Sequence, residues 1–137
     1  MKNNLLVRYF IAVVVTYLIT VILVSQLNAN SIVAMGVELS VQDRLTTTWY
    51  DLLGMAMYYL PIIALSLLIA FIFVSKVLLR FFDEGILLYV LSGFASIAVM
   101  HIVLKHVFSL SVFVLNPETL GLLLQCMAGS FGAWIFF

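Results

Sequence analysis

The stretch that decides the fold lies at residues 85–106 and reads GILLYVLSGFASIAVMHIVLKH. It is long enough to cross a bilayer as an α-helix, which takes about 20 apolar residues. His101 and Lys105 are four residues apart in it, as are Ser92 and Ser96, so each pair shares one face of a helix. A polar stripe on a membrane helix has to be covered by neighbouring helices. The stretch therefore predicts a helical bundle in a membrane.

The composition also indicates an integral membrane protein. Of 137 residues, 66% are hydrophobic and 9% are charged, and the mean hydropathy is +1.28. Soluble domains carry roughly 25% charged residues. The formal net charge is zero and no run of basic residues occurs, so we expect no nucleic-acid partner.

Three further apolar runs accompany the first, and together they predict an all-α four-transmembrane-helix bundle in a single membrane domain, residues 1–137. The predicted spans are about 9–27, 60–79, 86–104 and 118–137. Lys2 and Arg8 before the first run give it some likeness to a secretory signal peptide. Its apolar part exceeds the ~7–15 residues of a signal peptide, so we expect a retained helix.

Residues 28–59 are predicted to form a long first extracytoplasmic loop, because three acids occur in them: Glu38, Asp43 and Asp51. Ser40 followed by Asp43 is typical of a helix start. We therefore expect a short amphipathic helix over about 41–50 in this loop. Aromatic residues near its end would anchor it at the membrane surface, where it would cap one end of the bundle.

The basic residues predict the orientation of the bundle. One side carries four of them and the other side two: Lys2, Arg8, Lys76 and Arg80 against Arg44 and Lys105. The positive-inside rule then places both termini in the cytoplasm (N-in, C-in). The expected location is a bacterial inner membrane.

The fourth run has the strongest packing pattern in the chain. Asn116 and Pro117 predict its start, as N-cap and first helical residue. Small or polar residues then recur at four-residue spacing: Gly121, Gln125, Gly129 and Ala133, with Ala128 and Gly132 as a second pair. Such patterns allow helices to approach closely, within one subunit or between subunits. We expect Ser92 and Ser96 to serve helix packing in the same way.

His101 is the candidate for chemistry inside the membrane. At ~1.5 Å per residue it lies about 24 Å along the helix from Gly85, within the outer part of a ~30 Å core. Lys105 would lie at the membrane surface, where a long cationic side chain is ordinary. One interpretation is a small polar cavity formed by His101 and Lys105 under the loop acids Glu38, Asp43 and Asp51. The other is a neutral histidine hydrogen-bonded to a neighbouring helix, for instance to Thr20 or a tyrosine.

Several chemistries are excluded because the residues they need are missing. The other histidine, His106, is on the same helix as His101, so the pair cannot clamp a haem from two sides. Cys126 is the single cysteine, which rules out an internal disulfide or a thiolate zinc site. All six acids lie at helix ends or in the long loop, whereas a small proton-coupled exporter would require a carboxylate inside a spanning helix. We therefore predict no catalytic residue, metal or cofactor.

Three classes of function fit these observations. The sequence favours a non-catalytic accessory, regulatory or immunity-type membrane protein, because so few ionisable groups face inward. The first alternative is a homo-oligomeric small channel or transporter with a polar path near His101. The second is a lipid- or quinone-directed membrane enzyme. The expected partners are membrane lipids and either copies of this chain or a larger membrane complex.

Overall fold

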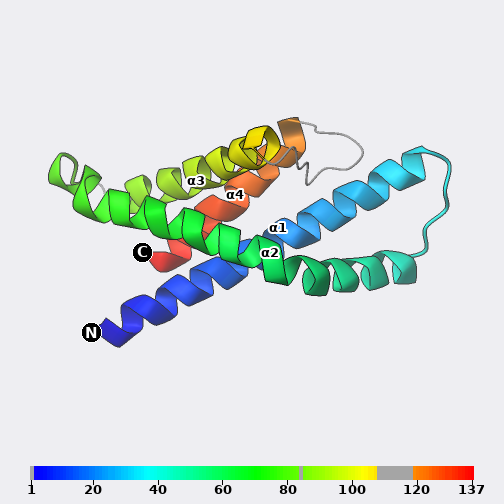
Figure 1. Cartoon of the computed structure of the whole chain (residues 1–137), viewed down its shortest axis with the longest axis horizontal. Helices are drawn as coiled ribbons and strands as arrows, with labels where there is room; N and C mark the ends of the chain where they lie inside the picture. Colours follow the sequence, from blue (N-terminus) through cyan, green and yellow to red (C-terminus); the bar gives the residue numbers. More distant parts are fainter. Residues whose placement is uncertain (1, 84, 108–118) are drawn as a thin grey trace.

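The computed structural model describes residues 2–83, 85–107 and 119–137, and these are almost entirely helical (Figure 1). The helices are α1 (Lys2–Ala34), α2 (Val41–Lys76), α3 (Gly85–Val107) and α4 (Thr119–Phe136), with a 3₁₀ turn η1 (Leu78–Arg80) after α2. No strand occurs in these ranges. Helices α1, α2 and α3 are each long and apolar enough to cross a membrane, whereas α4 is apolar but shorter.

The helices run up and down and form a ring, in which α1 packs against α2 and α4, and α3 packs against the same two helices. Both chain termini and the connection between α2 and α3 lie at one end, which we call the terminal end (Figure 1). The connection between α1 and α2 lies at the opposite end, the hairpin end. The structure thus supports a membrane protein built as a helical bundle.

Aromatic side chains fill the core near the terminal end. Phe71 of α2 stacks on Phe136 of α4 with 4.3 Å between ring centroids, and Tyr89 of α3 meets Phe71 edge-on at 5.7 Å. Such pairs add to the stabilisation that burial of their area provides. Arg8 donates a hydrogen bond to the carbonyl of Phe137 at 3.0 Å, which ties the two ends of the chain together.

The small residues of α4 lie inside the bundle. All six predicted packing residues of this helix are buried: Gly121, Gln125, Ala128, Gly129, Gly132 and Ala133. A Cβ atom built on Gly129 would collide with the carbonyl of Gly93 in α3, and one on Gly132 with the hydroxyl of Thr16 in α1. The stripe therefore serves contacts within the chain, on two sides of α4.

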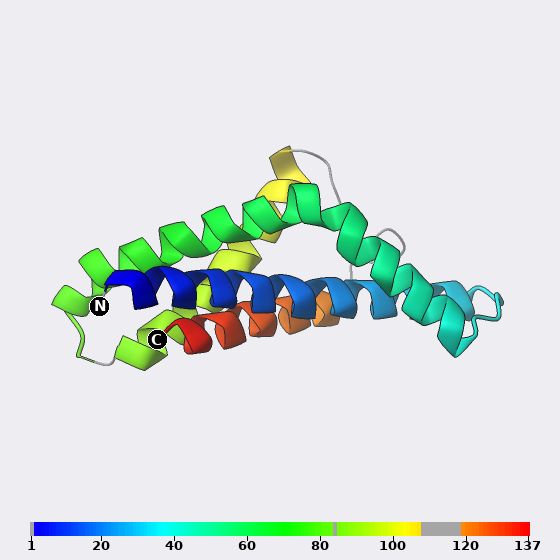
Figure 2. The ribbon, with the colours of Figure 1, turned by 90° about the horizontal axis from the view of Figure 1, so that it is seen from below.

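The predicted long loop over residues 28–59 is wrong. Helix α1 continues to Ala34, and α2 is unbroken from Val41 through Pro61, so that only residues 35–40 connect them. Proline lacks one N–H donor, which bends a helix without ending it when packing holds both halves. Figure 2 shows α2 changing direction part-way along. The expected short helix is thus the first part of α2 and not a separate element.

The turn between α1 and α2 has clear local causes. Gly36 has a φ of +91°, a conformation that glycine adopts without steric cost, and it ends α1. Ser40 and Asp43 form a reciprocal capping box: the Asp43 amide donates to Ser40 Oγ at 3.1 Å and the Ser40 amide to Asp43 Oδ2 at 3.0 Å. These bonds fix the first residue of α2.

The hairpin of α1 and α2 extends beyond the other two helices (Figure 1). With 33 and 36 residues, α1 and α2 are about 50 and 54 Å long, whereas α3, with 23 residues, is about 35 Å long. A helix of about 30 Å suffices for the hydrocarbon core. The predicted N-cap Asn116 and first-turn Pro117 of α4 lie outside the described residues.

Gly129→Ala should destabilise the protein by about 1–3 kcal/mol, because the added methyl group overpacks the contact with Gly93. Gly54→Ala is the matched control: nothing lies within 4 Å of a Cβ at this position in α2, so the better helix former should be neutral or stabilising. Unfolding in detergent micelles measures both. Equal stability of the two variants would contradict a tight contact between α3 and α4.

Candidate functional site

His101 belongs to a hydrogen-bonded group of three side chains from three helices. Its Nε2 lies 3.0 Å from the hydroxyl of Tyr59 in α2. The same hydroxyl lies 3.4 Å from Oε1 of Gln125 in α4. Tyr59 and Gln125 are buried, and His101 is partly buried. We call Tyr59, His101 and Gln125 the polar cluster.

The hydrogen bonds of His101 define the role of each ring nitrogen. Nδ1 lies 2.8 Å from the carbonyl oxygen of Ile97, which can only accept, so Nδ1 carries the proton. In a neutral imidazole Nε2 is then an acceptor, as is Oε1 of Gln125, and the single hydroxyl proton of Tyr59 is donated to one of these two atoms at a time. The ring is thereby fixed to its own helix on one side and to α2 on the other.

The acids that were predicted to accompany His101 lie elsewhere. Because α2 is helical from Val41 onward, Asp43 is about 24 Å along the helix from Tyr59 at ~1.5 Å per residue. Glu38 is in the turn at the hairpin end, and Asp51 is partly buried on α2. No hydrogen bond joins any of these carboxylates to His101 in the described residues. The structure does not bring together the residues of the predicted cavity.

Lys105 is exposed one turn beyond His101 on α3. Ser92 and Ser96, the other predicted polar pair of this helix, are partly buried and donate to carbonyls of their own helix, at Tyr89 (2.8 Å) and Gly93 (3.0 Å). All three side chains are therefore away from the Tyr59 hydroxyl. The polar residues expected to form one stripe on α3 therefore lie in different environments: Lys105 is exposed, whereas the two serines are partly buried.

A second polar group joins α1 to α2 near the hairpin end, and the sequence analysis missed it. The Ser25 hydroxyl and the Gln26 amide both lie 3.0 Å from Thr48 Oγ1. Arg44 donates to Asn30 Oδ1 at 2.8 Å. We call Ser25, Gln26, Asn30, Arg44 and Thr48 the hairpin clamp. The sequence indicates this group by a pair of polar residues spaced four apart on each helix: Gln26 and Asn30 on α1, and Arg44 and Thr48 on α2.

The first turn of α2 carries the clearest electrostatic effect outside the apolar part of the helices. Asp43 accepts hydrogen bonds from the hydroxyl of Ser40, at 2.7 Å, and from its amide. These bonds stabilise the ionised carboxylate and hold the pKa of Asp43 below its ordinary value. The side chain is thus engaged in capping α2.

Three buried polar atoms have no hydrogen-bond partner in the described part of the chain: Oγ1 of Thr16, Oγ1 of Thr20 and Nε2 of Gln125. Both threonines are on α1 and fully buried, and Thr16 lies against Gly132 of α4. Thr20 was one of the two partners expected for His101, and Tyr59 occupies that role. At Thr16, therefore, α1 packs closely against α4 because the side chain is small, and not because its hydroxyl makes a hydrogen bond.

The cluster can hold three helices together, but its surroundings offer little for catalysis. Among the described residues, no three His, Cys, Asp or Glu side chains lie together as metal ligands would. Cys126, next to Gln125, is buried and is a free thiol. In the part of the chain that the structure describes, no carboxylate makes a hydrogen bond to His101; its ring nitrogens lie next to Tyr59 and the carbonyl of Ile97.

Tyr59→Phe should destabilise the protein, because it removes the one hydroxyl that His101 and Gln125 share. The expected loss is about 0.6–1.7 kcal/mol, the range measured for hydrogen bonds between membrane helices. Tyr58→Phe is the control, since Tyr58 is 77% exposed and Tyr59 is 6% exposed. Denaturant titrations in micelles compare them. If both tyrosines tolerate the change equally, the cluster does not hold the helices together.

Thr20→Val should leave stability unchanged or raise it by about 1 kcal/mol. The substitution keeps the shape of the side chain and removes a buried hydroxyl without a partner. Ser25→Ala, also at a buried position of α1, should instead lower stability, because it breaks the bond to Thr48. The same titrations apply. A clear loss with Thr20→Val would mean that the hydroxyl has a partner or a function.

The polar cluster, the hairpin clamp and the small-residue contacts all lie between helices of one chain, and each uses its polar groups in packing. The chain matches no protein-family model, no curated protein and no solved structure.

Proposed function

We propose that the protein is a non-catalytic accessory or regulatory subunit of a larger membrane complex, which it binds through the hairpin of α1 and α2. The observation that carries this proposal is a row of exposed apolar side chains along the first half of α2. They recur every four residues: Val41, Leu45, Trp49, Leu53 and Met57, each more than half exposed. We call them the hairpin ridge.

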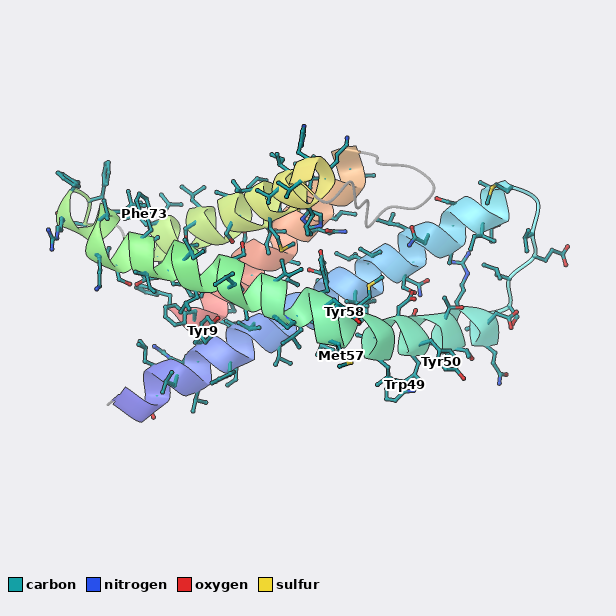
Figure 3. The ribbon with its side chains drawn as sticks, viewed as in Figure 1. Tyr9, Trp49, Tyr50, Met57, Tyr58 and Phe73 are labelled. Atoms are coloured by element: carbon teal, nitrogen blue, oxygen red, sulfur yellow. The ribbon has the colours of Figure 1, made fainter. Side chains whose placement is uncertain are left out.

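The ridge has the form of a helix-packing surface. Side chains at i and i+4 make the ridges that fit into grooves of another helix. Trp49 and Met57 lie on the side of α2 that faces away from α1 (Figure 3). Between Val41 and Trp49 the surface is hollowed, and Leu45 lines this open concavity of about 600 Å³.

The surroundings of the ridge favour a protein partner over lipid. The same stretch of helix carries charged residues at 43, 44 and 51, and the hairpin clamp holds its opposite face to α1 through polar side chains. These groups belong in water or among headgroups. A contiguous apolar surface in such a setting commonly marks a protein interface.

The interior of the bundle supports a non-catalytic role. His101 is engaged by Tyr59 and by the carbonyl of Ile97, and the loop acids lie away from it. The small-residue stripe of α4, on which a homo-oligomeric channel would rely for subunit contacts, is buried against α3 and α1. The hairpin ridge, in contrast, consists of side chains that are exposed and so free to contact a partner.

The proposal includes four spans with both termini in the cytoplasm of a bacterium. Helix α4 is short, but it packs between α1 and α3, each of which is long enough to span. The termini share one end with Arg8, Lys76 and Arg80. The positive-inside rule favours the cytoplasm for that end and a bacterial inner membrane for the protein.

A photo-crosslinking amino acid at Leu45 should capture one defined membrane protein in cells that express the full chain. The captured protein should also co-purify with the unmodified chain, and Leu45→Glu with Trp49→Glu should abolish this co-purification, because buried charges disfavour an apolar interface. The same crosslinker at Ile69, an exposed residue further along α2, is the control and should yield lipid adducts.

The identity of the captured species decides between the functions. Crosslinks from Leu45 to a second copy of this chain would favour the channel or transporter alternative. Lipid adducts alone, at both positions, would contradict a role for the hairpin ridge in protein binding.

A further inference from the structure

A second unengaged surface lies at the opposite end of the bundle, between α2 and α3. It is a groove of about 540 Å³. Its lining is made of aliphatic, aromatic and small side chains, with Leu78 and Leu88 toward the terminal end, Ser66 and Val99 toward the middle of the bundle, and Ala95 between them on α3.

The polar groups in the groove are already satisfied. Ser66 donates to the carbonyl of Ser96 at 3.0 Å, across from α2 to α3. Ser92 and Ser96 donate to carbonyls of α3 itself. The serines therefore offer small size and no free donor, and an occupant of this groove meets an apolar wall.

The length of the groove fits one leaflet of a bilayer. From Leu88 to Val99 the lining of α3 extends for about 16 Å at ~1.5 Å per residue. Half of a ~30 Å hydrocarbon core is about 15 Å. A spanning helix of another protein would use the whole thickness, whereas an acyl chain occupies one leaflet only. The length of the groove therefore favours an acyl chain of a lipid over a spanning helix of another protein.

Two cations flank the terminal end of the groove in the sequence. Leu78, at the terminal end of the groove, lies between Lys76 and Arg80 in the sequence, and both of these side chains are exposed. Phe81 and Phe82 follow and are exposed as well, as aromatic residues at a membrane surface often are. Asp83 and Glu84 come next in the sequence, so the net charge of residues 76–84 is zero and the headgroup contact would depend on Lys76 and Arg80 themselves.

We propose that this groove binds an anionic phospholipid from the leaflet at the terminal end. One acyl chain lies between α2 and α3, and Lys76 and Arg80 bind the phosphate of the headgroup. Basic residues beside a gap between membrane helices are a recurring form of headgroup site. Arginine offers the phosphate two parallel donors, and lysine adds a point charge.

The test uses the full chain in nanodiscs of equal parts palmitoyl-oleoyl phosphatidylglycerol and phosphatidylcholine. After release into detergent, native mass spectrometry measures which lipid stays bound. We expect the phosphatidylglycerol to be retained about thirtyfold more often, as two cations near an anionic headgroup would give. Lys76→Gln with Arg80→Gln should bring the ratio near one. Lys105→Gln, at the other end of α3, should keep the preference.

A second pair of variants tests the groove itself. Ala95→Phe fills it and should reduce the retention of both lipids. Val103→Phe, on an exposed part of α3 outside the groove, should have no effect. Lack of a preference in the unmodified chain would overturn the proposal, as would unchanged retention in Ala95→Phe. A change of oligomeric state in Ala95→Phe with the same lipid count would assign the groove to a protein helix instead.

Discussion

The close approach of α3 and α4 at Gly93 and Gly129 is the contact on which the rest of the bundle depends. Neither position has room for a Cβ atom, because each would meet the backbone of the other helix. In a membrane, helices gain little from burying apolar surface against each other, so close packing and hydrogen bonds hold them together. Two turns from Gly93 along α3 is His101, and one turn from Gly129 along α4 is Gln125. The contact therefore sets the distance at which the polar cluster forms.

Different forces hold the two ends of the molecule. Near the terminal end, stacked rings of Phe71 and Phe136 and the small-residue contacts pack the four helices tightly. At the hairpin end only α1 and α2 continue, and polar side chains such as Thr48 and Arg44 join them. The same two helices are thus held by side-chain hydrogen bonds at one end and by close packing at the other.

The sequence predicted the features that depend on the membrane as solvent. Three of the four apolar runs became helices of spanning length, and the stripe from Gly121 to Ala133 became a buried face. The sequence-based prediction failed for residues 28–59, because a segment with several polar residues can form either a loop or a helix. Residues 28–59 were taken for a loop on their charges, although Ser40 and Asp43 marked the helix start that is observed.

The surroundings of His101 could be predicted only in part, for a related reason. A histidine within a span needs a partner, and a tyrosine was one of those expected; the position of Tyr59 depended on α2 being continuous through Pro61. That continuity also places Asp43 about 24 Å along α2 from Tyr59 at ~1.5 Å per residue, while Asp51 is partly buried on the same helix. Inside the described part of the bundle, His101, Tyr59 and Gln125 form the polar cluster, and the hydroxyls of Thr16 and Thr20 have no partner. The hairpin ridge and the groove between α2 and α3 lie on the outer surface. The accessory role that we propose depends on these outer surfaces, because their exposed apolar side chains are the groups that a partner would contact.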